Sequence, residues 1–176
     1  MPTTSNYVPK HRAVKQRVLN DWKRMTALGA TLPAALGTVA LSGSTAQAGD
    51  ERREEQIRHA VQIARDQKAD AYEYGSDGPE QFDCSGLTQF VFDQAGIDIP
   101  RTSDDQANSG RRISKSNMRP GDLMAFHDGG DVYHIALYTG QTQSGKPRMI
   151  EAGSEDTQVR STGAWSSEWY GVTLRR

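Results

Sequence analysis

Cysteine is nearly absent from this sequence, because Cys84 is the only one among 176 residues. An intramolecular disulfide is therefore excluded, and the single thiol is either a small buried apolar side chain or a reactive group. The sequence also lacks paired cysteines and the HExxH and HxxxH spacings that commonly bind zinc. We therefore expect no metal and no other cofactor.

Long hydrophobic runs are missing except near the N-terminus, where Met25 to Leu41 is uncharged over 17 residues. Six lysine and arginine residues precede this run, and Ala46-Gln47-Ala48 follows it with a small-x-small cleavage pattern. These features predict a secretory signal peptide over residues 1–48 and one domain over residues 49–176. An uncleaved anchor is the alternative, but the run is short for a spanning helix. After cleavage we expect no stable membrane insertion.

Positive charge is scarce after the predicted signal peptide. Residues 49–176 hold 15 of the 21 basic residues and 21 of the 22 acidic residues, which gives a formal net charge of −6. Nucleic-acid binding depends on basic surface, so this balance argues against a nucleic-acid partner. We expect a monomer.

Hydrophobic spacing predicts helices first and an antiparallel meander afterwards, which is an α+β fold with N-terminal helices packed on a central antiparallel sheet. Ile57, Ala60, Val61 and Ala64 form a helical stripe, and Asp50 is a candidate N-cap. The expected helices span about 51–67, 84–95 and 103–109. The expected strands span 123–126, 132–139, 148–152 and about 158–161, with a connector over 113–117. Aromatic residues 165, 169 and 170 are expected to cover the core.

Cys84 lies at the start of a predicted helix. Asp83 is the candidate N-cap, and Gly96 has the position of a C-terminal glycine. Free backbone N–H groups and the helix dipole stabilise a thiolate in a first turn. A buried structural cysteine is the alternative interpretation.

A thiolate nucleophile needs a basic partner, and the partner needs a group that orients it. His134 opens a predicted strand, whereas His59 and His127 are expected to be solvated. Glu151 lies in the next strand within an otherwise apolar stretch, and a carboxylate can hold the imidazole N–H. Asp156 is a weaker candidate. Whether Glu151 faces His134 depends on the strand register, which the sequence leaves open.

Several segments resemble the NlpC/P60 family of secreted cell-wall cysteine peptidases. The similarity runs from about residue 60 to residue 159, in the order and spacing of the family. It rests on Phe82-Asp83-Cys84-Ser85-Gly86-Leu87-Thr88-Gln89-Phe90-Val91, on Ile99-Pro100-Arg101-Thr102-Ser103 with Gln106, on Arg119-Pro120-Gly121-Asp122-Leu123 and on His134-Ile135-Ala136-Leu137-Tyr138-Thr139-Gly140.

The resemblance implies a papain-like core in residues 49–176 and a secreted, extracellular, cell-wall-associated hydrolase. Its expected activity is hydrolysis of amide bonds in peptidoglycan stem peptides, often the bond between D-γ-glutamate and a diamino acid. Cys84 would attack the carbonyl, His134 would protonate the leaving amine, and Glu151 would be the third polar residue.

The resemblance also suggests substrate-binding residues. Asp83 and Ser85 match positions that hold the free amine of a trimmed stem peptide in some members. Tyr72 and Tyr74 lead into the Cys84 segment, where they either line the substrate site or pack against the next helix.

Two positions depart from the family pattern. The third polar residue is most often histidine in the family, and here it reads Glu151. Relatives often have Trp-Gly-Gly where this chain has Tyr74-Gly75-Ser76. These departures keep a second hypothesis open, in which the domain binds wall material without cleaving it and replacement of Cys84 leaves that binding unchanged.

Overall fold

The computed structural model describes residues 44–176. Most of the predicted signal peptide, residues 1–43, lies outside the described residues. Residues 44–48 form the start of helix α2 (Ser44–Asp66), so this helix begins before the predicted start at Glu51. Asp50 therefore lies inside α2, and its expected role as N-cap is wrong. None of the helices within residues 44–176 is long and apolar enough to cross a membrane.

Two further helices follow α2. Helix α3 (Cys84–Gln94) begins after the N-cap Asp83, whose side chain accepts a hydrogen bond from the Gly86 N–H. Helix α4 (Ser103–Ser109) has Thr102 as its N-cap. Both caps agree with the sequence, because aspartate and threonine side chains satisfy the free N–H groups of a first turn.

The main sheet is antiparallel and has the strand order β3-β8-β4-β5-β6-β7. Its strands are β3 (Arg111–Ile113), β4 (Leu123–His127), β5 (Val132–Gln141), β6 (Pro147–Glu151), β7 (Arg160–Gly163) and β8 (Trp169–Thr173). Two short strands, β1 (Ala71–Tyr72) and β2 (Gln81–Phe82), pair in parallel before α3. A 3-10 turn spans Lys115–Asn117.

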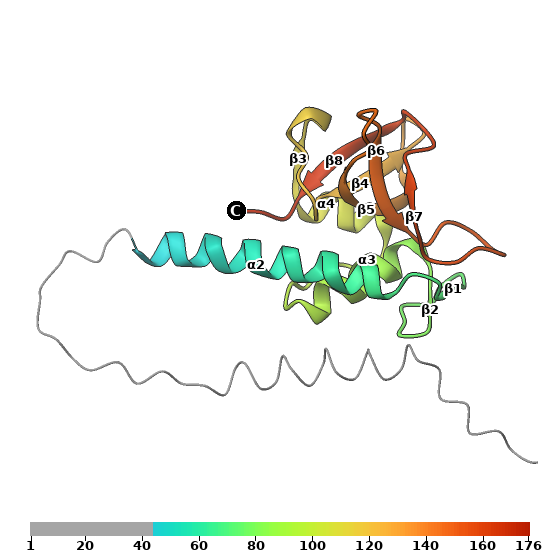
Figure 1. The fold of residues 1–176 in the computed structure, drawn as a ribbon, viewed down its shortest axis with the longest axis horizontal. Coiled ribbons are helices and arrows are strands. Elements are labelled where there is room, and N and C mark those ends of the chain that lie inside the picture. The colour runs from blue at the N-terminus through green and yellow to red at the C-terminus, as the bar shows by residue number, and fades with distance from the viewer. Residues whose placement is uncertain (1–43) are drawn as a thin grey trace, which may run out of the picture. The chain divides into compact units, whose positions relative to one another are not determined.

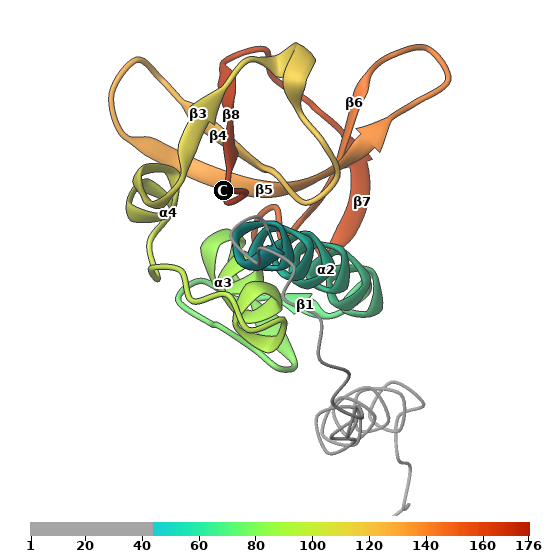
Figure 2. The same cartoon turned by 90° about the vertical axis from the view of Figure 1, so that its left-hand side faces the viewer.

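The sheet curves over α2 and α3, which lie on one of its faces (Figure 1, Figure 2). Successive residues of β5 belong in turn to two different apolar clusters. Ile135 and Leu137 join the larger cluster with the helical stripe of α2 and with α3. Ala136 and Tyr138 join a smaller cluster with residues such as Trp169. This alternation is the period of a strand that is covered on both faces.

The C-terminal segment packs against the N-terminal half of α2. Arg175 is 8% exposed at its side chain and forms ion pairs with Glu54 of α2 and with the buried Asp122. Its guanidinium also donates to the Pro120 carbonyl. This cluster fastens the last residues to the helix and to the turn before β4.

The α+β class and the helices-first order are confirmed, but some strands differ from the prediction. The expected connector over 113–117 contains the end of β3 and the 3-10 turn, and the last predicted strand is shifted to Arg160–Gly163. Strand β8 was not predicted, and it enters the sheet between β3 and β4. Local periodicity does not show this pairing, because the partners are distant in the chain.

Candidate active site

Cys84 is the first residue of α3 and is partly buried. The first backbone N–H groups of a helix have no acceptor within the helix, so they present positive charge at this end. Gly86 follows in the same turn. A Cβ at this position would collide with the Ser76 carbonyl oxygen and would lie 2.9 Å from Asp77 Cα. The glycine thus allows the turn before β2 to pack against the N-terminus of α3.

Asp83 and Ser85 flank the cysteine and bind Arg101. The Asp83 carboxylate accepts two hydrogen bonds from the Arg101 guanidinium, at 3.0 and 2.6 Å, and Arg101 also donates to Ser85 Oγ at 2.8 Å. Burial alone would raise the pKa of Asp83, but hydrogen bonds from Arg101 and Gly86 outweigh this and lower it. Asp83 therefore remains ionised, with its charge already compensated by Arg101.

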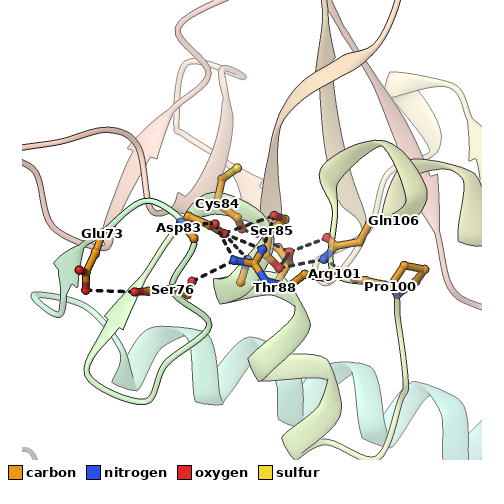
Figure 3. A network of polar contacts seen from close by, with 11 residues as sticks. Glu73, Ser76, Asp83, Cys84, Ser85, Thr88, Pro100, Arg101 and Gln106 are labelled. Carbon is orange, nitrogen blue, oxygen red and sulfur yellow. Dashed lines mark hydrogen bonds and ion pairs between the residues drawn. The ribbon is translucent and has the colours of Figure 1, made fainter.

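Buried side chains connect this network to α4. Gln106 is fully buried, and its amide donates to the carbonyls of Ser85 and Pro100 at 2.8 Å. Thr88 donates to the Gln106 side-chain oxygen at 2.6 Å. Figure 3 shows this network, with the sulfur of Cys84 pointing away from it. The network fixes the helix N-terminus and leaves the thiol outside it.

The register of β5 and β6 brings His134 and Glu151 together. Leu137 pairs with Ile150 and Tyr138 with Met149, so continuing this register places Glu151 opposite Ala136, on the face that His134 shares. His134 Nε2 lies 3.0 Å from Glu151 Oε2, and both residues are buried. The hydrogen bond to Glu151 leaves the other ring nitrogen, Nδ1, for Cys84.

Cys84 and His134 shift each other's protonation in opposite directions. Burial raises the pKa of Cys84, but hydrogen bonding to His134, the charge of its ring and the Ile135 N–H outweigh burial and lower it. Burial would lower the pKa of His134, but hydrogen bonds to Cys84 and Glu151 and their charges raise it from 6.5 to about 9. Both shifts favour a thiolate beside an imidazolium.

Glu151 has two further partners that the sequence analysis did not identify. Its Oε1 accepts from Arg160 Nε and Nη2 at 3.3 and 3.2 Å, and its Oε2 accepts from Trp165 Nε1 at 3.1 Å. Trp165 was expected to cover the core, but it is 51% exposed and its ring lies 5.7 Å from the His134 ring. Trp169 does pack in the core, at 5% exposure.

The thiol and the imidazole open onto a groove of about 550 Å³. Predicted substrate-binding residues Tyr72, Tyr74, Asp83 and Ser85 line it, together with Arg101, Thr102, Ser103, Tyr133, Gly153 and Trp165. Tyr74 is 83% exposed and Tyr133 is 51% exposed. The large apolar side chains that are most exposed within residues 44–176 thus gather at this one groove.

The other candidates lie away from the thiol. His59 is half-buried in α2, and His127 ends β4 beside the Tyr170 ring. Asp156 is exposed in the loop after β6 and has a positive φ of 62°. Among residues 44–176, His, Cys, Asp and Glu side chains form no group of three or more that would hold a metal ion.

The arrangement suits covalent catalysis on a carbonyl compound. A thiolate at a helix N-terminus is a nucleophile, an adjacent imidazolium can protonate a leaving group, and a buried carboxylate fixes the orientation of the ring. The groove in front of the thiol, at about 550 Å³, lies within the usual size range of ligand sites.

Comparison with known proteins identifies the family. The family model described as "NlpC/P60 family" matches residues 69–174. The chain therefore belongs to the NlpC/P60 family, a family that includes endopeptidases and peptidoglycan hydrolases. The match confirms the resemblance drawn from the sequence.

The curated relatives include the "Probable endopeptidase p60" of Listeria monocytogenes, which is 43% identical over 99 residues, or 56% of this chain and 19% of that protein. The chain thus spans about a fifth of the length of that relative. Among solved structures, the P60 domain of the Mycobacterium avium subspecies paratuberculosis antigen MAP1204 has a TM-score of 0.61 at 28% identity, covering 72% of this chain and 98% of that one. The NlpC/p60 domain of the peptidoglycan hydrolase SagA has a TM-score of 0.60 at 28% identity, covering 67% and 98%.

Proposed function

We propose that this protein is a secreted cysteine endopeptidase that hydrolyses amide bonds in peptidoglycan stem peptides. The observation that carries the proposal is that Cys84 and His134 line the same groove, while Glu151 holds the His134 ring at 3.0 Å from its Nε2. The family supports the substrate class, since relatives are named endopeptidases and peptidoglycan hydrolases.

In the proposed reaction, the Cys84 thiolate attacks the carbonyl carbon of the amide. The oxyanion that forms accepts a hydrogen bond from the Cys84 backbone N–H at the start of α3. The His134 imidazolium gives its proton to the leaving amine as the C–N bond breaks, which leaves a thioester on Cys84. Neutral His134 then takes a proton from water, and the resulting attack releases the acid and restores the thiolate.

The preferred bond in this proposal joins D-γ-glutamate to a diamino acid, as the family resemblance implies. Tyr72 and Tyr74 would contact the stem peptide from the wall of the groove. Asp83 and Ser85 would act together with Arg101. An ammonium group on the substrate would therefore compete with Arg101 for the Asp83 carboxylate.

The proposal also includes export. Residues 1–48 would direct secretion and be removed, and a monomer consisting of residues 49–176 would act on the cell wall outside the cell. The N-terminal amino acid of the mature protein, read by sequencing after export, tests the cleavage site directly.

The test of the activity compares the purified protein with its Cys84→Ala variant on purified peptidoglycan and on defined stem peptides. Mass spectrometry follows newly released amines, and the product mass identifies the bond. Product from the wild type alone supports a cysteine peptidase. If neither protein releases product and both bind peptidoglycan equally, the domain is a wall-binding module and the enzymatic proposal fails.

A further inference from the structure

The carboxylate of Glu151 is almost completely buried and saturated with donors. The Glu151 side chain has no solvent-exposed area, and it forms ion pairs with His134 and Arg160. Its two oxygens are divided between these partners. Oε2 accepts hydrogen bonds from His134 and Trp165, and Oε1 accepts hydrogen bonds from two nitrogens of Arg160. Buried carboxylates are stable only with such compensation.

Arg160 and Trp165 reach Glu151 from different elements. Arg160 pairs directly opposite Glu151 in the β6–β7 ladder, so its side chain projects from the same face of the sheet. Trp165 comes from the segment between β7 and β8, and its ring stacks on Phe126 at 4.7 Å and 12°. The stack fixes the indole N–H, and the ladder fixes the guanidinium.

We infer that Arg160 and Trp165 are positioning residues that hold Glu151 and offset its charge, so that Glu151 orients His134 without retaining the proton that catalysis must release. This inference rests on the proposed function, because it concerns the same cysteine–histidine pair. In this account Arg160 and the Trp165 N–H act through Glu151, although the Trp165 ring also lines the groove.

The charges predict the direction of the effect. The titratable groups facing Glu151 are His134 from β5 and Arg160 from β7, and Cys84 faces His134 from α3. Arg160 weakens the attraction of Glu151 for the imidazolium, both by neutralising the carboxylate and by repelling the ring. Loss of Arg160 therefore strengthens that attraction, and the His134 imidazolium should persist to higher pH. Loss of the Trp165 N–H acts in the same direction, because it leaves more negative charge on Oε2.

The test measures the rate of Cys84 alkylation by iodoacetamide as a function of pH. Cys84 is the only cysteine, so the signal has no background from other thiols. In the wild type, the rate should rise through the lowered pKa of Cys84 and change again when His134 titrates near pH 9. The assay needs no substrate and no turnover.

The variants are Arg160→Gln, Arg160→Lys and Trp165→Phe, with Arg148→Gln as the control. Trp165→Phe removes the N–H donor and keeps an aromatic ring to stack on Phe126. Arg148 is exposed on β6 and donates to Ser161, so its replacement changes the net charge equally without touching Glu151.

In Arg160→Gln, the second transition in the alkylation rate, which reports His134, should move to higher pH by about half a pH unit. The shift is modest because the Arg160 side chain is half exposed and screened by solvent. The pH of the second transition should stay near the wild-type value in Arg160→Lys and should rise in Trp165→Phe. It should be unchanged in Arg148→Gln. The inference is overturned if Arg160→Gln behaves as Arg148→Gln does. A wild type that shows one ordinary thiol transition overturns the proposed function itself.

Discussion

Replacing Glu151 by glutamine should lower the upper pH limit of activity while leaving activity near pH 6.5 almost unchanged. Glutamine has the same shape as glutamate, and its carbonyl can still accept the His134 N–H. Its NH2 group then faces Arg160, whose half-exposed side chain can turn toward solvent. It lacks the negative charge that lies 3.0 Å from His134 Nε2. The substitution therefore separates the electrostatic role of Glu151 from its role in orienting the ring.

The magnitude follows from charge and distance. Two unit charges about 4 Å apart interact by about 4 kcal/mol at an effective dielectric constant of about 20, and one pKa unit corresponds to about 1.4 kcal/mol. Arg160 offsets part of this attraction. We therefore expect the pKa of His134 to fall by about 1.5 units, to roughly 7.5.

The sign follows from the protonation state that catalysis needs. The imidazolium is present below the pKa of His134 and is lost as the pH rises through that value, which is about 9 in the wild type. With a pKa of roughly 7.5, the protonated fraction at pH 8.5 is about eightfold lower than in the wild type. At pH 6.5 His134 remains almost fully protonated in both proteins.

The assay is kcat/KM for a defined stem peptide between pH 5 and 10, since this ratio reports the pKa values of the free enzyme. Glu155→Gln is the control, because Glu155 is exposed and its replacement changes the net charge equally. If the fall of kcat/KM at alkaline pH occurs at the same pH in the Glu151→Gln variant as in the wild type, the electrostatic role of Glu151 is refuted.

Two further substitutions test how the site is supported. Gly86→Ala should destabilise the protein by about 1–3 kcal/mol, because the new methyl group meets the rigid backbone at Ser76; urea unfolding measures this, and an unchanged free energy of unfolding would show that the turn can move aside. Arg175→Ala should cost about 3–5 kcal/mol, because it leaves Asp122 buried without its partner and removes the tie to Glu54. A melting temperature unchanged from the wild type would show that this cluster contributes nothing.

Features set by neighbouring residues could be predicted from the sequence. Asp83 caps α3 through the Gly86 N–H, and Thr102 caps α4, because both interactions lie within one helical turn. The position of Cys84 in the first turn of α3 follows from the cap. The structure places the His134 ring at the same groove as Cys84 and places His59 and His127 elsewhere, and the catalytic role of His134 stays a prediction.

Features that depend on register could not be predicted in this way. The contact between His134 and Glu151 depended on the register of β5 against β6, which the sequence left open. Arg160 faces Glu151 only because β6 and β7 align in one particular register. The predicted strand at about 158–161 did contain Arg160, so a fixed register would have revealed this partner.

Contacts between residues far apart in the sequence were the hardest to predict. Trp165 looked like a core residue because large aromatic side chains usually pack, but its indole N–H binds the catalytic candidate Glu151. The pairing of Arg101 with Asp83 likewise joins residues 18 positions apart. The sequence around Arg101 contains no local signal for such a partner.

The most direct test of the central claim is the mass of the protein during turnover. Wild-type protein is mixed with a stem peptide, quenched in acid within the first turnovers, and measured intact and after digestion. The account predicts an adduct on the peptide that contains Cys84, with the mass of the released acid product less one water, and no adduct in the Cys84→Ala variant. Release of the same amine by the Cys84→Ala variant, without any adduct on the wild type, would contradict it.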